Sequence, residues 1–395
     1  MSLETNRLIA SLKPSASMQL MARAKAMKAA DPSIIDLAGG EPDFDTPERI
    51  TMEAVRQLAK GYTHYTVGPG LPELREKIAQ KLREENGCHY LSEGIIVTPG
   101  AKFAIYLAVR ALVNPGDEVM YLTPAWVSYA SIIEASGAAP VSVELDSRSH
   151  YRLTEELLES GVSDKTRLLL INYPNNPTGK MLHADELAAL KRFLLRHPQI
   201  RVVSDEIYER IRYDGKENLS PAADEQIAER VITVNGFSKS VAMTGWRIGY
   251  LAAEPGLAKV MGKLFQHTIT NVSGFIQKAA VTALSCTDEI ESMRARFEAR
   301  RSLFVDGLNA IEGVHCEKPE GAFYAWVSFD LPGMDSAAAA EFLLQKAGVI
   351  GVPGSAYGEN RLCCMRFSFA AADEALAQAV RKIAAAMEEY RNGRN

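Results

Sequence analysis

The chain has 395 residues, of which 47% are hydrophobic and 24% are charged, and its formal net charge is −5. This is the composition of an ordinary globular protein; it excludes disordered and collagen-like classes, and the length suffices for two domains with substantial cores. Because the chain is acidic and has no block of like charges, it lacks the electrostatic footprint of a nucleic-acid-binding protein, and nucleic acid is not expected as a partner.

The N-terminal sequence lacks the basic region and the continuous apolar stretch of a signal peptide, and no later run approaches the length of a membrane span. The five cysteines show no C-x-x-C spacing and are interpreted as small core residues in a reducing compartment. We therefore expect a cytoplasmic protein that has no membrane partner.

Short apolar runs alternate with helical patterns through the first two thirds of the chain. Such runs are typical of strands that are buried on both faces. They cover residues 94–98, 118–122, 167–172, 201–205, 231–234 and 249–253. Between them, residues 102–112 and 184–195 carry apolar side chains three and four positions apart. The β-α-β-α order predicts an α/β fold with a mostly parallel sheet covered by helices.

The pattern changes beyond about residue 290. A long charged helix is predicted over residues 288–308, followed by strand-like runs at residues 322–327 and 364–369 and by a terminal amphipathic helix. This part is interpreted as a smaller α+β domain.

Asp205 ends one of the predicted strands, at the edge where open α/β sheets bind their ligands. An unpaired carboxylate is costly in such an apolar setting, so Asp205 needs a cationic partner, for which a protonated pyridine nitrogen is a candidate. The alternative is a helix N-cap, a position that favours Asp. Tyr208, three residues later, either places its hydroxyl near the same point or is a core aromatic residue.

Lys239 lies among small and apolar residues, and Arg247 follows eight positions later. A lysine amine is a nucleophile only when it is unprotonated, and an apolar pocket or a nearby cation lowers its pKa enough for that. Arg247 could supply this cation and hold a phosphate. The pattern indicates a Schiff-base lysine, although a solvated surface lysine is the commoner case.

Three further segments are compatible with the same ligand. Pro174–Gly179 contains two prolines that would hold the Asn176 amide rigidly as a donor; the alternative is a simple tight loop. Gly100–Lys102 opens a helix after a strand, where free N–H groups and the helix dipole favour phosphate, although a glycine is common there. Trp126 is either a core anchor or a ring stacked on a planar cofactor.

A series of motifs, in order along nearly the whole chain, resembles the class I aminotransferases of fold type I. The motifs are Gly39–Pro47, Tyr62–Tyr65 with Gly70–Arg75, Pro174–Gly179, Ser204–Tyr208, Ser238-Lys239, Met243–Arg247 and Met365–Phe369. Within the family, the chain is most similar to the bacterial branch that contains aspartate, aromatic and prephenate aminotransferases.

The resemblance implies the fold type I architecture and an enzyme that works as a homodimer. The large domain, residues 47–289, would bind the cofactor on a mostly parallel seven-stranded sheet. The small α+β domain would comprise residues 290–395, and residues 1–46 would form an N-terminal segment that joins it. The activity implied is transfer of an amino group from an L-amino acid to a 2-oxo acid, by a ping-pong cycle on pyridoxal 5′-phosphate.

The resemblance also implies roles for the residues that would act on the cofactor ring. Lys239 would form the Schiff base with the cofactor and, once displaced by substrate, would shuttle a proton. Asp205 would keep the ring nitrogen protonated. Tyr208 and Asn176 would bind the phenolic oxygen of the ring, and Trp126 would stack on its face.

The phosphate ligands implied within one chain are the backbone of Ala101 and Lys102, Ser238 and Arg247. Tyr65 would reach the phosphate of the neighbouring subunit, so that the active sites of the dimer are shared. One departure from many relatives is Gly236, which stands where they carry a phosphate-binding serine. Ser238 or a water molecule would substitute for that serine.

The resemblance assigns the substrate α-carboxylate to the planar fork of Arg366, with Arg361 as a rival. Other implied substrate contacts are Asn176, Trp126 and the backbone of Gly40. Lys13 and Lys102 resemble positions that bind a second substrate carboxylate in the aspartate and prephenate branch. The alternative is that Lys13 is a surface residue and that Lys102 touches only solvent or phosphate, so a dicarboxylic substrate and an aromatic one both stay open.

Other enzyme classes fit the sequence less well. A nicotinamide dehydrogenase needs a complete glycine fingerprint after a strand, a serine hydrolase needs G-x-S-x-G and a zinc enzyme often shows H-E-x-x-H, and the chain shows none of these. No metal is therefore expected. The remaining alternative is a lyase that acts at the substrate Cβ or Cγ, because it would share the lysine, the aspartate and the phosphate site.

Overall fold

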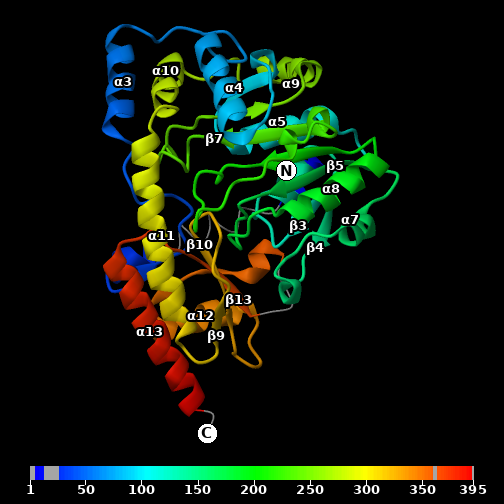
Figure 1. Ribbon diagram of the computed structural model, residues 1–395. Coiled ribbons are helices and arrows are strands. Elements are labelled where there is room, and N and C mark those ends of the chain that lie inside the picture. Colours follow the sequence, from blue (N-terminus) through cyan, green and yellow to red (C-terminus); the bar gives the residue numbers. More distant parts are fainter. Residues whose placement is uncertain (1–4, 13–25, 359–362, 394–395) are drawn as a thin grey trace.

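The computed structural model describes residues 5–12, 26–358 and 363–393. A seven-stranded sheet forms the centre of its larger part (Figure 1). Its strands are β2 (Ile95–Thr98), β3 (Glu118–Thr123), β4 (Ala139–Glu144), β5 (Thr166–Asn172), β6 (Arg201–Asp205), β7 (Val231–Gly236) and β8 (Gly249–Ala252). They lie in the order β2-β8-β7-β6-β5-β3-β4, and every neighbouring pair is parallel except the two that β8 makes. The predicted mostly parallel α/β sheet is confirmed.

Side chains alternate between the two faces of this sheet, and both faces are buried. Along β5, Leu168 and Leu170 enter one apolar cluster while Leu169 and Ile171 enter another, and all four are at most 1% exposed. Helices supply the other half of each cluster, so neither face meets water. This explains why the strand runs are continuously apolar in the sequence.

Helices cover both faces of the sheet, and two of them, α5 and α8, match the helices predicted at residues 102–112 and 184–195. They are α3 (Glu48–Ala59), α4 (Pro72–Asn86), α5 (Ala101–Leu112), α6 (Tyr129–Ala135), α7 (Glu155–Gly161), α8 (Ala184–Arg196), α9 (Pro255–Thr268) and α10 (Gly274–Ala283), and a short α1 (Arg7–Ser11) precedes them. Helices α5, α6 and α9 pack on one face, while α4 and α8 pack on the other.

Six of the seven strands lie within two residues of their predicted bounds, and β4 was missed. β4 is an edge strand and most of its residues are only partly buried, so it has no continuous apolar run. It also contains Pro140, which is tolerated at a sheet edge because no hydrogen-bond donor is needed there, but which argues against a strand in the sequence.

The C-terminal part contains a second, antiparallel sheet. Its elements are α11 (Thr287–Asn309), β9 (Val314–Cys316), β10 (Tyr324–Phe329), α12 (Ser336–Ala347), β11 (Val349–Ile350), β12 (Val352–Pro353), β13 (Cys364–Ser368) and α13 (Asp373–Asn392). The four-stranded order is β12-β13-β10-β9, and β11 pairs in parallel with β1 (Ile35–Asp36) from the N-terminal segment. The predicted long helix, the two longer strands and the terminal helix are all present.

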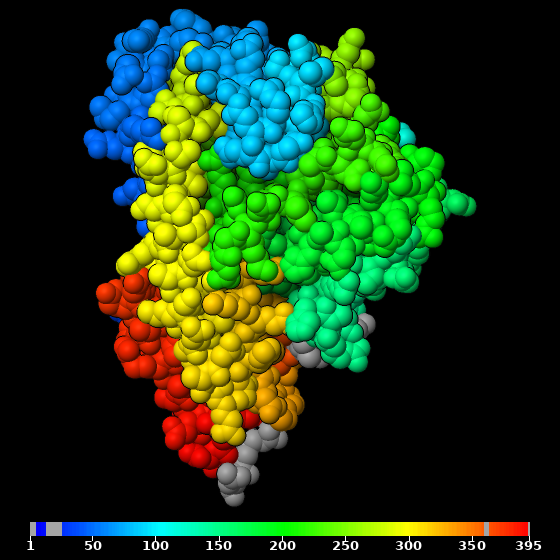
Figure 2. Space-filling model, viewed as in Figure 1, coloured from blue at the N-terminus to red at the C-terminus, as the bar shows by residue number. Residues whose placement is uncertain are grey.

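Helix α11 connects the two parts. In Figures 1 and 2 it runs along one side of the molecule, from α3 and α10 down to α13 and the second sheet. Among the described residues, no helix combines the length and the apolar character needed to cross a membrane.

Candidate active site

A cavity of about 360 Å³ lies at the carboxyl ends of the parallel strands, between the large sheet and β13. Its lining contains almost every site residue predicted from the sequence: Gly40, Ala101, Lys102, Trp126, Asn176, Asp205, Tyr208, Ser238, Lys239, Arg247 and Arg366. The exception is Tyr65, whose side chain is 89% exposed away from this cavity. Lys13 and Arg361 lie outside the described residues.

Lys239 follows β7 and projects into the cavity, where its Nζ donates a hydrogen bond to the carbonyl oxygen of Gly40 at 2.5 Å. Burial lowers the pKa of Lys239 from 10.5 to about 8, and the charges of Arg366 and Arg247 act in the same direction. More of this amine is therefore unprotonated near neutral pH than that of an exposed lysine, and the unprotonated form is the one that acts as a nucleophile or a base.

Asp205 is the last residue of β6 and is 4% exposed. The Tyr129 hydroxyl donates to its Oδ2 at 2.7 Å and the Ile207 N–H donates to its Oδ1 at 3.3 Å. Burial raises the pKa of Asp205 to about 6, although both hydrogen bonds and Lys239 act to lower it. The segment after it forms turns, so the helix N-cap alternative is wrong. In the described part of the chain, no cation forms an ion pair with this carboxylate.

Arg366 comes from β13, and its guanidinium is held from several sides. Nη1 donates to Asn176 Oδ1 at 3.2 Å, and Nη2 donates to the carbonyl oxygens of Ala38 at 2.6 Å and Gly39 at 3.2 Å. The group also lies 4.3 Å from the centre of the Tyr324 ring. Its buried Nε has no hydrogen-bond partner among the described residues. A rigid cation with an unused donor is suited to binding a planar carboxylate.

The predicted phosphate site is built from close backbone contacts around the first turn of α5. Gly100, with φ 86°, precedes the helix, and a Cβ there would lie 2.7 Å from Arg247 Nη2. A Cβ at Gly249 would lie 2.8 Å from the Ala101 nitrogen. Because neither glycine has a side chain, the backbone that opens α5 at Ala101 and Lys102 and the Arg247 guanidinium can border the same cavity, where the N–H groups of a helix N-terminus suit an anion.

Gly236 has a steric explanation. A Cβ at this position would lie 2.9 Å from Gly249 Cα and 3.2 Å from the Ile248 carbonyl oxygen, both of which belong to the backbone. A serine would therefore require β7 and β8 to move apart. Ser238, two residues later, lines the cavity and carries the nearest hydroxyl in sequence.

Sequence reasoning missed two tyrosines that line this cavity. Tyr129 opens α6 and contacts Asp205, and Tyr324 opens β10 and shares a hydrogen bond of 2.8 Å with the Tyr208 hydroxyl. Tyr324 lies in a run whose sequence pattern indicates only a strand. A signal for Tyr129 existed, since it stands three residues after Trp126, and the two rings pack edge to face with centroids 5.3 Å apart.

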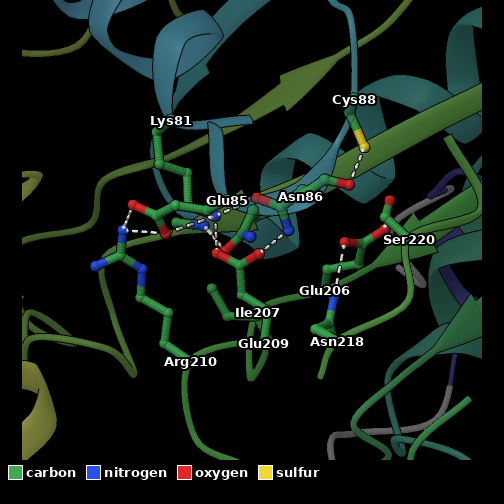
Figure 3. Close-up of polar contacts among 12 residues, drawn as sticks. Lys81, Glu85, Asn86, Cys88, Glu206, Ile207, Glu209, Arg210, Asn218 and Ser220 are labelled. Atoms are coloured by element: carbon green, nitrogen blue, oxygen red, sulfur yellow. Dashed lines mark hydrogen bonds and ion pairs between the residues drawn. The ribbon is translucent and has the colours of Figure 1, made fainter. Parts of the chain in front are cut away.

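A buried layer of charged residues supports the turn that carries Asp205 and Tyr208. Glu206 and Glu209 belong to this segment but do not line the cavity, and Figure 3 shows Glu209 pointing toward Lys81 and Asn86. Glu209 accepts hydrogen bonds from Lys81 and Asn86, both on α4. Burial acts to raise the pKa of Glu209, but the charges of Lys81 and Arg210 hold it below its usual value. The turn is thus joined to α4 by a buried ion pair.

Glu206 has a different environment. Its Oε1 accepts hydrogen bonds from the hydroxyls of Ser204 at 2.9 Å and Ser220 at 2.7 Å. Burial, followed by the nearby charge of Glu209, raises the pKa of Glu206 to about 7. Both carboxylates behind the active-site turn are therefore satisfied, one by a cation and one by hydroxyl groups.

Comparisons with known proteins agree on one family. The family model described as "Aminotransferase class I and II" matches residues 32–383. The aspartate aminotransferase of Musicola paradisiaca is 41% identical over 374 residues, which cover 94% of this chain and 93% of that protein. The probable aspartate/prephenate aminotransferase of Aquifex aeolicus is 39% identical and covers 96% of this chain and 98% of its own length.

Solved structures give the same result for the fold. The aspartate aminotransferase of Rhizobium meliloti superposes with a TM-score of 0.93 at 38% identity and covers 98% of this chain and 99% of its own. The aspartate aminotransferase of Thermus thermophilus, solved with maleate, gives a TM-score of 0.92 at 36% identity and covers 98% of this chain and 100% of its own.

Proposed function

This chain belongs to the class I and II aminotransferases and is a pyridoxal-phosphate-dependent transaminase, and from that premise we propose its substrate class and the roles of its residues. It moves an amino group from an L-amino acid to a 2-oxo acid; its relatives support this activity and not that of a lyase on the same fold. We propose that the cavity around Lys239 is the active site, because it gathers the groups that this cofactor requires.

The residues of the cavity fit pyridoxal phosphate. Asp205 is a buried carboxylate without a cation and suits a protonated ring nitrogen. The first turn of α5, with Arg247, suits the phosphate. Asn176 uses its Oδ1 for Arg366, which leaves its Nδ2 to donate to the phenolic oxygen together with the Tyr208 hydroxyl. Trp126 lines the cavity and presents an aromatic surface for the ring.

When bound, the cofactor supplies an electron sink that stabilises negative charge at the substrate Cα. Lys239 is placed to take the proton from that carbon and would deliver it to the cofactor carbon that receives the nitrogen, which its pKa of about 8 permits near neutral pH. Arg366 binds the α-carboxylate and thereby fixes the position of Cα relative to the lysine. Asp205 holds the proton at the ring nitrogen.

We propose that the preferred substrates are dicarboxylic, such as L-aspartate. The observation that carries this proposal is the place of Lys102, which lines the same cavity as Arg366 and has its Nζ 4.9 Å from the centre of the Trp126 ring. Burial and the charge of Arg247 both lower the pKa of Lys102. Lys102 is a cation besides Arg366 that can bind a second carboxylate, and several relatives are named aspartate aminotransferases.

Replacing Lys102 with methionine tests this substrate class. We expect kcat/KM for L-aspartate to fall by roughly 10- to 100-fold, the value of one charge-assisted hydrogen bond, while kcat/KM for L-alanine stays within about two-fold. Steady-state assays with one 2-oxo acid acceptor measure both. An equal loss for the two amino acids would assign Lys102 to the phosphate instead and would contradict the proposal.

We propose a homodimer in which Tyr65 of each subunit reaches the phosphate of the other. In support, α3 exposes apolar side chains that a monomer would leave in water: Met52 is 51% exposed, Val55 50% and Leu58 43%. Tyr65 follows α3 in the chain and is among the most exposed aromatic residues described.

The dimer proposal predicts that Met52→Glu with Val55→Glu produces a monomer in sedimentation experiments, with weakened cofactor binding. Leu195→Glu is the matched control, because Leu195 is equally exposed at 50% but lies on α8. The control is expected to stay a dimer. Tyr65→Phe should keep the dimer and weaken cofactor binding by roughly three- to ten-fold, the value of one hydrogen bond. A double glutamate variant that remains a dimer would exclude this surface as the interface.

Two broader expectations also belong to the proposal. Ile35 and Leu37 pack into the same core as the second sheet. This supports assigning residues 1–46 to the small domain, residues 290–395, beside a large domain of residues 47–289.

All five cysteines are free thiols, and four of them are buried, which supports a reducing compartment such as the cytoplasm.

A further inference from the structure

The Tyr129 side chain lines one wall of the cavity and contacts both Asp205 and Trp126, the two residues that would face the cofactor ring. Its hydroxyl donates to Asp205 Oδ2 at 2.7 Å, and its ring packs edge to face against Trp126 at 5.3 Å with an interplanar angle of 84°. Tyr129 is 2% exposed, so water does not compete for its hydroxyl.

The hydrogen bond restricts how Asp205 can use its carboxylate. The Tyr129 O–H points at one oxygen and the Ile207 N–H points at the other, so the carboxylate plane cannot turn without losing a donor. A carboxylate that must meet a ring N–H in one direction benefits from such a restraint. Two other ionisable groups lie near Asp205. One is Lys239, whose charge favours the ionised form of Asp205, and the other is Tyr208.

We propose that Tyr129 is a positioning residue for Asp205, whose ionised carboxylate it holds toward the place of the cofactor's ring nitrogen. This inference rests on the proposed role of Asp205. Through the same side chain, Trp126 is held at the angle at which it faces the cavity. Tyr129 thus supports both the carboxylate of Asp205, which would meet the ring nitrogen, and the Trp126 side chain, which would meet the ring.

The chemistry gives this role a pH signature. A hydroxyl donates a stronger hydrogen bond to an ionised carboxylate than to a protonated one. Without the Tyr129 hydroxyl, the pKa of Asp205 rises above its present value of about 6. At pH 5.5, Asp205 is then protonated in a larger fraction of the cofactor-free Tyr129→Phe variant than of the parent chain. It must lose this proton before it can pair with the ring N–H of the cofactor, which weakens binding. At pH 9 the carboxyl is ionised with or without the hydroxyl.

The test is the equilibrium dissociation constant of pyridoxal phosphate from the full-length chain, measured at pH 5.5 and at pH 9. For Tyr129→Phe we expect binding to weaken about five- to ten-fold at pH 5.5 and less than about two-fold at pH 9. A loss of equal size at both pH values would mean that Tyr129 only fills space, and no loss at either would equally overturn the proposal.

Tyr90→Phe is the matched control, because the Tyr90 hydroxyl is also held by buried groups, Thr233 Oγ1 at 3.0 Å and the Val231 carbonyl oxygen at 3.1 Å, but both are neutral. The ratio of its dissociation constant for pyridoxal phosphate to that of the parent chain should be the same at pH 5.5 and at pH 9. If Tyr129→Phe folds poorly, 3-fluorotyrosine at position 129 keeps the packing and donates more strongly. It should tighten binding at pH 5.5; unchanged or weaker binding would overturn the proposal.

Asp205→Asn separates this inference from the proposed function. It should weaken binding of the cofactor strongly, and adding Tyr129→Phe to it should then change little, because the charge that the hydroxyl holds is already gone. If Asp205→Asn leaves binding unchanged, the proposed role of Asp205 fails. If Asp205→Asn weakens binding but Tyr129→Phe acts equally with and without it, only the role of Tyr129 fails.

Discussion

Replacing Lys239 with alanine is expected to reduce transamination at least about 10⁴-fold while pyridoxal phosphate still binds without a covalent link. The lysine is both the nucleophile and the base of the proposed mechanism, and its Nζ is the only amine near the Gly40 carbonyl within the described part of the cavity. The phosphate site and Asp205 are untouched by the substitution, so the cofactor keeps its other contacts. Amino-group transfer from L-aspartate to a 2-oxo acid measures the loss.

Borohydride reduction checks the covalent link independently of activity. The parent protein should gain the mass of the reduced cofactor on the peptide that contains Lys239, and the alanine variant should gain none. Lys259→Ala is a suitable control, since this lysine is exposed on α9 and is not among the residues that line the cavity. Turnover of the Lys239 variant within ten-fold of the parent would refute the assignment.

Replacing Lys81 with methionine should destabilise the protein by about 3–5 kcal/mol at pH 7.5, because it leaves the Glu209 carboxylate buried without its cation. The Lys81 and Glu209 side chains are 5% and 7% exposed. Denaturant unfolding of the cofactor-loaded protein measures the loss. The lowered pKa of Glu209 in the parent contributes stability above its unfolded pKa of about 4.5. In the variant the carboxyl can protonate, so the loss should shrink toward pH 5.

Two further variants test the origin of this effect. Lys81→Met with Glu209→Leu removes both charges and should recover most of the stability, since an apolar pair of similar volume often replaces a buried ion pair without loss. Lys77→Met, on the exposed side of the same helix, should cost less than about 0.5 kcal/mol. A double variant as unstable as Lys81→Met alone would show that the ion pair is not the source of the loss.

The sequence predicts most of the large sheet because its strands are buried on both faces and therefore read as continuous apolar runs. Strand β4 breaks this rule at the sheet edge, and β9, β11 and β12 are too short, at three, two and two residues, to show any period. The site is predictable for a related reason. Parallel strands bring their carboxyl ends to one edge, so polar residues that follow separate strands meet in space.

The contacts behind the site could not be predicted in this way. Lys81 and Glu209 are 128 positions apart, and Tyr129 and Asp205 are 76 apart. Nothing in the local pattern around Lys81 distinguishes it from the exposed lysine Lys77 on the same helix. Whether a charged side chain turns toward the core or toward water depends on a partner from another element, and local periodicity carries no information on that partner.

The direction of β8 places Lys239 and Arg247 on one loop at the edge of the sheet that borders the cavity. Since β8 runs against its neighbours, its first residue lies at the edge where β7 ends, and the chain between the two strands stays at that edge for its whole length. Lys239 and Arg247 both lie on this segment, residues 237–248. One loop would thus hold both ends of pyridoxal phosphate: the aldehyde through Lys239 and the phosphate through Arg247. We expect this loop to tolerate no insertion or deletion, because its length sets the spacing of the two anchors.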